Sequence, residues 1–334
     1  MRVVVTAPCR VDLAGGTLDI WPLGLLHHGS LTVNVAIPTR VRMEVELAGP
    51  IGHVEHAEGD GPLRMLGPED TAHDLTAAVC FALRSTGRVR VRVLEQAPIG
   101  SGLGGSSSYA VALARAVLAL EERSMGERAL VALLRDLEAR VLGIPTGTQD
   151  HWAAIRGGVL AVHIEPGGES IERLQVDPNW VSERLTVFFT GINHHSGMVN
   201  WEVIRRRLDG DESTRSALES IADAARLCRQ ALLAQDEHEV GVAVAAEWAA
   251  RRRLAPEVCP DDVETVVCRA RDAGATAVKA CGAGGGGSLL VWHPPGLRGR
   301  IAEALADAAP SGRILESGVA RDGCEVLQIA KSPA

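Results

Sequence analysis

The sequence predicts an α+β fold, in which strands and helices are mixed along the chain without regular alternation. Apolar and polar residues alternate strictly over residues 89–94, which is typical of a half-buried strand, and residues 30–37 and 40–47 share this pattern. Apolar residues at helical spacing predict helices over 106–122 and 127–142. Because single helices do not separate successive strands, a doubly wound parallel sheet is disfavoured.

Length and composition indicate an ordinary globular chain of two domains. The chain has 334 residues, of which 46% are hydrophobic and 23% charged, so disordered and collagen-like classes are excluded. A stretch rich in Gly and Pro at 166–178 is the expected connection between the domains. We therefore expect one domain over residues 1–170 and a second over 180–334.

Charge, aromatic content and cysteine usage limit the function classes. The net charge of −8 gives no diffuse positive field, and three Phe with one Tyr provide no stacking platform, so no nucleic-acid partner is expected. No apolar run approaches the ~20 residues that span a bilayer, so no membrane partner is expected. The seven scattered cysteines are typical of reduced thiols, which predicts a cytoplasmic location.

The remaining elements follow from the same patterns in chain order. A β-branched run predicts a first strand over 2–7, a loop follows at 9–19, and the Gly- and acid-rich stretch 49–70 is expected to be another loop. The second half is mostly helical over 196–273, with breaks expected near Pro256 and Pro260. The other expected elements are a helix at 72–85, a turn at 143–147, strands at 157–164 and 185–190, a strand at 288–293, a helix at 297–308, and strands at 313–317 and 324–329.

Small residues fill the loop before the helix at 106–122, and one serine of 106–108 is expected to be its N-cap. Glycine lets a ligand approach the backbone, and free amides at a helix N-terminus attract anions. The loop is therefore predicted to bind a phosphate-like anion, with a plain strand-to-helix turn as the alternative. No Lys follows its glycines, as a Walker A loop requires. Gly100, Gly102 and Gly105 fit a dinucleotide-binding motif, but Glu121 ends a helix where a dehydrogenase places that acid on a strand.

A second glycine-rich loop spans residues 279–287 and contains four consecutive glycines. Ordering such a run costs backbone conformational entropy. We therefore expect the chain to pass close to another surface or to a bound phosphate at this loop. A plain hairpin loop is the alternative.

Three segments, at residues 10–19, 98–108 and 279–287, resemble in order and spacing the three motifs of the GHMP kinases, the superfamily of galactokinase, homoserine kinase, mevalonate kinase and phosphomevalonate kinase. Ala14-Gly15-Gly16 followed by Asp19 is similar to the first motif of bacterial heptose 7-phosphate kinases and of the fucokinase kinase domain. The resemblance implies a two-lobed fold, with a ribosomal-S5-like N-terminal lobe and a ferredoxin-like C-terminal lobe.

The resemblance also implies roles for individual residues. Asp150 matches the catalytic aspartate and Arg10 the basic residue beside it, while Ser106 and Glu138 fall near the positions of the Mg²⁺ ligands. The residues expected to bind ATP are Pro98, Gly100, Ser101, Gly102, Leu103, Gly104, Gly105, Ser106, Ser107 and Ser108. The residues expected to bind the substrate are Thr17, Asp19, Gly147, Gly284 and Gly285.

The implied function is an ATP- and Mg²⁺-dependent phosphotransferase acting on a hydroxyl of a small sugar or sugar phosphate, such as a heptose 7-phosphate or fucose. Galactokinases have Gly-Glu-His where this chain has Gly15-Gly16-Thr17, which disfavours galactose. The alternatives are a catalytically inactive ligand-binding member and an isoprenoid-pathway kinase or decarboxylase. The sequence identifies neither the acceptor nor the oligomeric state.

Two further features remain open. The arginine clusters at 205–207 and 251–253 are either solvated helix faces or clamps for a phosphorylated acceptor. His194 and His195 either face the acceptor or belong to an ordinary loop.

Overall fold

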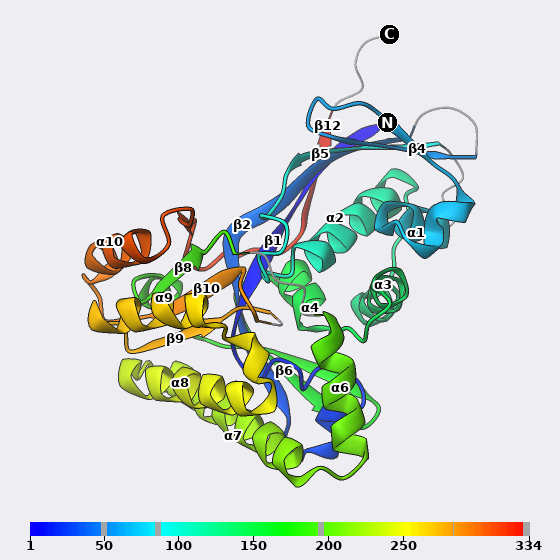
Figure 1. The fold of residues 1–334 in the computed structure, drawn as a ribbon. Helices are drawn as coiled ribbons and strands as arrows, with labels where there is room; N and C mark the ends of the chain where they lie inside the picture. The colour runs from blue at the N-terminus through cyan, green and yellow to red at the C-terminus, as the bar shows by residue number, and fades with distance from the viewer. Residues whose placement is uncertain (48–51, 84–87, 193–196, 283, 330–334) are drawn as a thin grey trace.

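The computed structural model describes residues 1–47, 52–83, 88–192, 197–282 and 284–329, which form two sheets with their covering helices (Figure 1). The larger sheet has the order β12-β1-β2-β5-β3-β4, and β6 joins it by pairing with β2 and β7. Its strands are β1 (Arg2–Ala14), β2 (Leu31–Leu47), β3 (Val54–Glu58), β4 (Arg64–Leu66), β5 (Val89–Glu95), β6 (Val159–Glu165), β7 (Gly168–Arg173) and β12 (Glu325–Ile329).

The two longest strands extend beyond the sequence-based prediction. β1 extends into the expected loop at 9–19 and ends at Ala14. β2 is a single strand over the range where two strands, at 30–37 and 40–47, were expected. The two pair antiparallel along nearly their whole length, with irregularities between Pro8 and Cys9 and between Asp12 and Ala14. Such irregularities let a strand continue past a proline, which has no N–H to donate. The expected loop at 49–70 also contains strands β3 and β4.

Helices cover one face of this sheet (Figure 1). α2 packs against β1 and β2, and its apolar side chains belong to the main core. The helices of this lobe are α1 (Leu75–Ala82), α2 (Gly105–Leu120), α3 (Glu127–Leu142) and α4 (Gln149–Arg156). α3 has the predicted bounds, and α4 begins at Gln149, with Thr148 between it and the predicted turn at 143–147.

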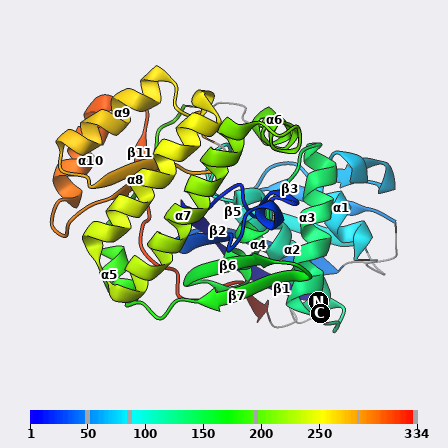
Figure 2. The same ribbon diagram turned by 90° about the horizontal axis from the view of Figure 1, so that it is seen from below.

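The smaller sheet is antiparallel, with the order β11-β8-β10-β9. Its strands are β8 (Leu185–Phe189), β9 (Ala277–Ala280), β10 (Ser288–Trp292) and β11 (Arg313–Leu315). Helices α7 and α8 run side by side along this lobe (Figures 1 and 2). The helices here are α5 (Pro178–Ser182), α6 (Gly197–Leu208), α7 (Glu212–Ala234), α8 (Glu237–Leu254), α9 (Asp261–Asp272) and α10 (Arg298–Ala308).

Short 3-10 helices complete the chain: η1 (Leu23–Leu26), η2 (Pro68–Ala72) and η3 (Pro256–Val258). η3 lies between α8 and α9, so the predicted helix breaks near Pro256 and Pro260 are confirmed. Within the described ranges, no helix combines the length and the apolar composition needed to cross a bilayer.

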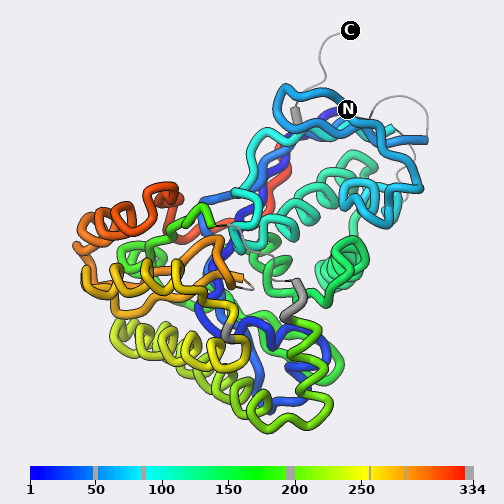
Figure 3. Tube along the Cα trace, viewed as in Figure 1, coloured from blue at the N-terminus to red at the C-terminus, as the bar shows by residue number. Residues whose placement is uncertain are grey.

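The connection between the lobes differs from the expected one. β7 occupies much of the stretch 166–178 and extends the larger sheet by pairing with β6. The last strand, β12, returns to the larger sheet and pairs antiparallel with β1 (Figure 3). The division at 1–170 and 180–334 therefore stays a prediction, and it leaves β12 out of the sheet to which it is bonded.

Candidate active site

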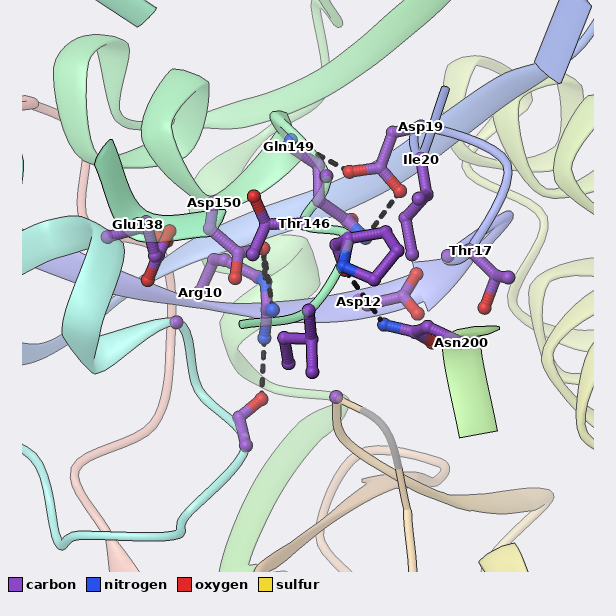
Figure 4. Close-up of a pocket in the computed structure, with 18 of the residues that line it drawn as sticks. Arg10, Asp12, Thr17, Asp19, Ile20, Glu138, Thr146, Gln149, Asp150 and Asn200 are labelled. Atoms are coloured by element: carbon purple, nitrogen blue, oxygen red, sulfur yellow. Dashed lines mark hydrogen bonds and ion pairs between the residues drawn. The ribbon is translucent and has the colours of Figure 1, made fainter. Parts of the chain in front are cut away.

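Two adjoining cavities lie where the glycine loops meet β1, α3 and α4. We call the cavity lined by the loop before α2 the loop cavity, with a volume of about 400 Å³, and the other the acid cavity, with about 230 Å³. Figure 4 shows the acid cavity, with Asp12, Asp19, Glu138 and Asp150 around it. Gly102, Gly104, Ser107, Glu138 and Asp150 line both cavities. Groups bound in the two cavities would therefore meet at these residues.

The loop cavity is lined by the predicted anion-binding segment. Every residue expected to bind ATP lines it except Ser108. Ser108 is buried, and its hydroxyl donates a hydrogen bond of 2.8 Å to the carbonyl oxygen of Pro8, so it anchors α2 to β1. The cavity also contacts side chains that the sequence did not single out, namely Leu75, Gln96, Ala97, Ile99 and Tyr109.

Three alternate glycines give this loop its shape. Gly100, Gly102 and Gly104 have φ of 73°, 71° and 70°, in the left-handed region that favours glycine. Gly104 is the N-cap of α2, so the expected serine N-cap is wrong. The first amide bonded within the helix is that of Ser108, which donates to Gly104. The amides of residues 105–107 therefore have no acceptor inside the helix, and this is the arrangement that binds anions.

The second glycine loop packs against the first, backbone to backbone. A Cβ on Gly102 would overlap the carbonyl oxygen of Cys281, and one on Gly282 would lie 2.9 Å from the Gly102 Cα. The Ser288 amide donates to the Ser101 carbonyl at 2.9 Å. The predicted close approach of this loop to another surface is confirmed, and the surface is the loop at 98–105.

Gly284 and Gly285, which were expected to bind the substrate, do not line the acid cavity. Gly284 packs against Val258, and the Gly285 amide donates to the Val258 carbonyl at 2.7 Å. Of the described residues in this glycine loop, Gly282 lines the acid cavity.

Asp150 and Arg10 form an ion pair between the two cavities. Asp150 lies in the first turn of α4, and Nε and Nη2 of Arg10, on β1, are each 2.6 Å from its Oδ1. Arg10 Nη1 donates to the Gly102 carbonyl at 2.6 Å. Burial alone would lower the pKa of Arg10, but the carboxylates of Asp150 and Asp12 outweigh it and raise that pKa. Arg10 therefore stays cationic and fixes the Asp150 carboxylate against the glycine loop.

Glu138, on α3, is buried and is bonded to Ser107, one of the residues expected to bind ATP. Ser107 Oγ donates to Glu138 Oε2 at 2.7 Å, and His151 Nε2 lies 3.3 Å from the same oxygen. Ser106 is exposed and lines the loop cavity. Successive helical residues point about 100° apart, so Ser107 faces α3 while Ser106 faces outward. Glu138 is therefore bonded to Ser107, and the expected role of Ser106 and Glu138 as Mg²⁺ ligands stays a prediction.

Asp19 closes the far end of the acid cavity (Figure 4). Its Oδ2 accepts hydrogen bonds from the amides of Thr148 and Gln149, at 2.8 and 3.0 Å. A Cβ on Gly147 would overlap this carboxylate, which explains the glycine there. Burial raises the pKa of Asp19 to about 7, the two amides oppose this, and the charges of Asp150 and Asp12 add to it.

A buried charge network that the sequence did not reveal lies behind the acid cavity. Lys279, on β9, has its Nζ 3.1 Å from Asp12 Oδ2 and 2.8 Å from Glu247 Oε2. Arg251 pairs with Glu247, and its Nη1 donates to the Thr17 hydroxyl at 3.0 Å. Burial would raise the pKa of Asp12, but the Lys279, Arg251 and Arg10 charges outweigh it and lower that pKa. Asp12 is therefore held as a carboxylate.

The individual arginines of the two clusters, at 205–207 and 251–253, have different surroundings. Arg251 lines the acid cavity, whereas Arg205 pairs with Glu202, and Arg252 pairs with Glu264. Asn200 and Gln149 also line the cavity and were not predicted. His194 and His195 lie outside the described residues.

Comparisons with known proteins found two matching family profiles and several similar proteins. The profile of the GHMP kinases N terminal domain matches residues 73–158, and that of the GHMP kinases C terminal domain matches residues 228–311. The chain is 27% identical over 319 residues to the bifunctional fucokinase/GDP-fucose pyrophosphorylase of Arabidopsis thaliana. The aligned region covers 87% of this chain and 30% of that protein. It is 28% identical over 216 residues to the D-glycero-alpha-D-manno-heptose 7-phosphate kinase of Campylobacter jejuni, covering 62% of each.

A solved structure supports the fold. The galactokinase of Lactococcus lactis, crystallised with galactose, superimposes with a TM-score of 0.77 at 14% identity, covering 97% of this chain and 95% of that one. This likeness shows the fold alone, and it confirms the predicted α+β class. The aligned regions span less than two thirds of the length of the two curated relatives named above.

Proposed function

The chain belongs to the GHMP kinases, and on that premise we propose that it transfers the γ-phosphoryl group of ATP to a hydroxyl of a sugar or sugar phosphate. The observation that carries the proposal is the meeting of two cavities at Asp150. The loop cavity offers backbone amides to the phosphates, and the acid cavity offers hydrogen-bond acceptors to a polyol. A donor and an acceptor bound there would have their reacting groups beside one carboxylate.

Asp150 is the group that would take the proton of the attacking hydroxyl. A general base must lie within hydrogen-bond reach of that proton, and Asp150 faces both cavities. Arg10 holds its carboxylate in place and keeps a positive charge beside the transferred group, where negative charge develops.

The oxygen donors at the junction fit Mg²⁺, which prefers a few protein oxygens and keeps its phosphate and water ligands. Glu138 and a hydroxyl of Ser107 or Ser106 would hold the ion, since Glu138 and Ser107 line both cavities. When bound, Mg²⁺ would neutralise charge on the phosphates. Among the described residues, no group of three or more His, Cys, Asp or Glu side chains forms a metal cluster of its own.

The composition of the acid cavity favours a sugar over the isoprenoid alternative. An isoprenoid acid carries a carboxylate, and the acid cavity already holds Asp12 and Asp19. The inactive alternative would not require Asp150 and Arg10 to be paired between two open cavities. The cytoplasmic location stays a prediction.

The test is ADP release from the purified protein with ATP, Mg²⁺ and a panel of sugars, sugar phosphates and mevalonate. We expect turnover with at least one sugar or sugar phosphate, and a loss of about 10³-fold in kcat in Asp150→Asn, which cannot accept the proton. Asp177→Asn is the matched control, because Asp177 caps α5, and asparagine caps equally well. Wild-type kcat in Asp150→Asn would contradict the mechanism, and turnover of mevalonate alone would contradict the substrate class.

A further inference from the structure

The acid cavity is lined by more carboxyl groups than guanidinium groups. Among the described residues that line it, the charged ones are Asp12, Asp19, Glu138, Asp150, Arg10 and Arg251. Four carboxyl groups therefore face two guanidinium groups. A phosphate ester, which carries about −1.5 to −2 charges at pH 7, needs cationic or amide donors that are free to bind it.

Both guanidinium groups are already committed to partners inside the protein. Arg10 is bonded to Asp150 and to the Gly102 carbonyl. Arg251 uses Nε and Nη2 on Glu247, Nη1 on Thr17, and Nη2 also on the Gly16 carbonyl. Both side chains are at least 94% buried, with exposures of 5% and 6%. Releasing Arg10 to a phosphate would break its ion pair with the partly buried Asp150, and releasing Arg251 would break its ion pair with the fully buried Glu247, and both changes are costly.

The cation behind the cavity is also balanced. Lys279 is fully buried between Asp12 and Glu247, so the two cations and two anions of the network cancel. The other arginines of the two clusters point elsewhere: Arg207 bonds to His27, and Arg253 to Ser220. The described part of the chain therefore offers no uncommitted cation to this cavity.

Asp12 has one oxygen without a hydrogen-bond partner among the described residues. Its Oδ2 faces Lys279, whereas its Oδ1 has no hydrogen-bond partner within the described residues, although it is buried. A buried carboxylate oxygen without a donor is costly, and a hydroxyl from a ligand would satisfy it. Asp12 lines the cavity on the side of Thr17 (Figure 4).

Taken with the proposed function, on which this rests, these contacts lead us to infer that the acceptor is an uncharged, unphosphorylated sugar. Asp12 is the specificity-determining residue: it accepts a hydrogen bond from an acceptor hydroxyl, and its pairing with Lys279 and Arg251 keeps these cations from binding a phosphate ester. The volume of about 230 Å³ suits this class, because it lies below the ~300–1,000 Å³ of sites for larger ligands.

The first experiment compares matched pairs on the wild-type protein. ADP release is measured with D-mannose and D-mannose 6-phosphate, D-galactose and D-galactose 6-phosphate, L-fucose and L-fucose 1-phosphate, and D-glycero-D-manno-heptose and its 7-phosphate. We expect kcat/KM for the best free sugar to exceed that of its phosphate ester at least 100-fold. A higher kcat/KM for any ester overturns this inference and leaves the proposed function standing. Absence of turnover with every sugar and ester overturns both.

The second experiment tests Asp12 directly. In Asp12→Asn we expect KM for the best free sugar to rise at least tenfold, KM for ATP to change less than twofold, and the preference over the matched ester to fall at least tenfold. Arg252→Ala is the control, because Arg252 is adjacent to Arg251 but bonds to Glu264, so all three quantities should stay at wild-type values. An unchanged preference in a folded Asp12→Asn overturns the role of Asp12. If the variant does not fold, the wild-type comparison decides the acceptor class.

Discussion

The loop cavity and the acid cavity meet at one carboxylate, but they are built in different ways. The loop cavity is formed mainly by one continuous segment, residues 96–107, which offers main-chain groups. The acid cavity is formed by side chains from β1, α3, α4, α6 and α8 and from the connecting segments 16–20 and 144–147, and many of these side chains are charged or polar. Main-chain amides accept any phosphate chain of the right shape, whereas fixed and paired side chains discriminate between acceptors. Binding of a common donor and selection of one acceptor are thus separated in space.

Among the substitutions that test this comparison, we expect the largest loss of activity from Gly104→Ala in the loop cavity. Its φ of 70° disfavours alanine, and a Cβ there would lie 3.0 Å from the Asp150 carboxyl atoms. We expect kcat/KM for ATP to fall at least tenfold, measured by ADP release at saturating acceptor.

Gly210→Ala separates the backbone strain from the effect on the cavity. Gly210 has a φ of 83°, and a Cβ added to it would have no atom within 4 Å, so it carries the strain without the contact. We expect it to keep wild-type activity and to lose about 1 kcal/mol of unfolding free energy. Equal loss of activity in both variants would contradict the role of Gly104.

The next effect concerns the acid cavity and its dependence on pH. The pKa of Asp19 is about 7 in the folded protein and 3.8 ordinarily, so between these values the folded state keeps a proton that the unfolded state has lost. The stabilising contribution of this proton is complete below about pH 3.8 and is lost as the pH rises through 7. Relative to Asp19→Asn, the wild-type unfolding free energy should fall by up to ~1.4 kcal/mol per pH unit across this window.

Urea unfolding of both proteins at pH 4.5, 5.5, 6.5 and 7.5 measures this difference. Asp19→Asn is a close match in shape, and its side-chain oxygen can still accept from the amides of Thr148 and Gln149. A difference between the two proteins that does not change with pH would show that Asp19 is ionised throughout this range.

The smallest effect separates the two serines where the cavities meet. Ser107→Ala removes the hydroxyl bonded to the buried Glu138, which should cost about 1–2 kcal/mol of unfolding free energy. Ser106→Ala changes an exposed residue and should stay within about 0.5 kcal/mol. We also expect Ser107→Ala to raise the Mg²⁺ concentration needed for half-maximal ADP release more than Ser106→Ala does. A larger increase of this Mg²⁺ concentration in Ser106→Ala would show that Ser106, and not Ser107, is the metal ligand.

The features that could be predicted from the sequence are those encoded locally. The alternation of apolar and polar residues over 89–94 predicts β5, and the helical spacing of apolar residues over 127–142 predicts α3. The loop of 98–107 is a continuous motif, so its place at a cavity could be predicted. The N-cap of α2 was missed because Gly104 in the left-handed region begins the helix without a side-chain cap.

The acid cavity could be predicted only in part, because its residues are brought together by packing between the lobes. Asp12 was assigned to a loop, since β1 continues past Pro8 only through its pairing with β2. Arg251 and Lys279 come from α8 and β9, and nothing near them in the sequence indicates a shared carboxylate. Asp19 and Gly147 were expected by resemblance to bind the substrate, and their close contact explains why residue 147 is glycine.

The pairing of β12 with β1 has a consequence for synthesis on the ribosome. β1 is synthesised long before β12, and until residues 325–329 follow, the edge formed by Arg2–Thr6 lacks the neighbour that it has in the folded chain. An unpaired strand edge on a nascent chain is open to association with other chains. The N-terminal lobe therefore cannot finish its sheet during translation of its own segment, and shortened chains that lack β12 should depend on chaperones to stay in solution.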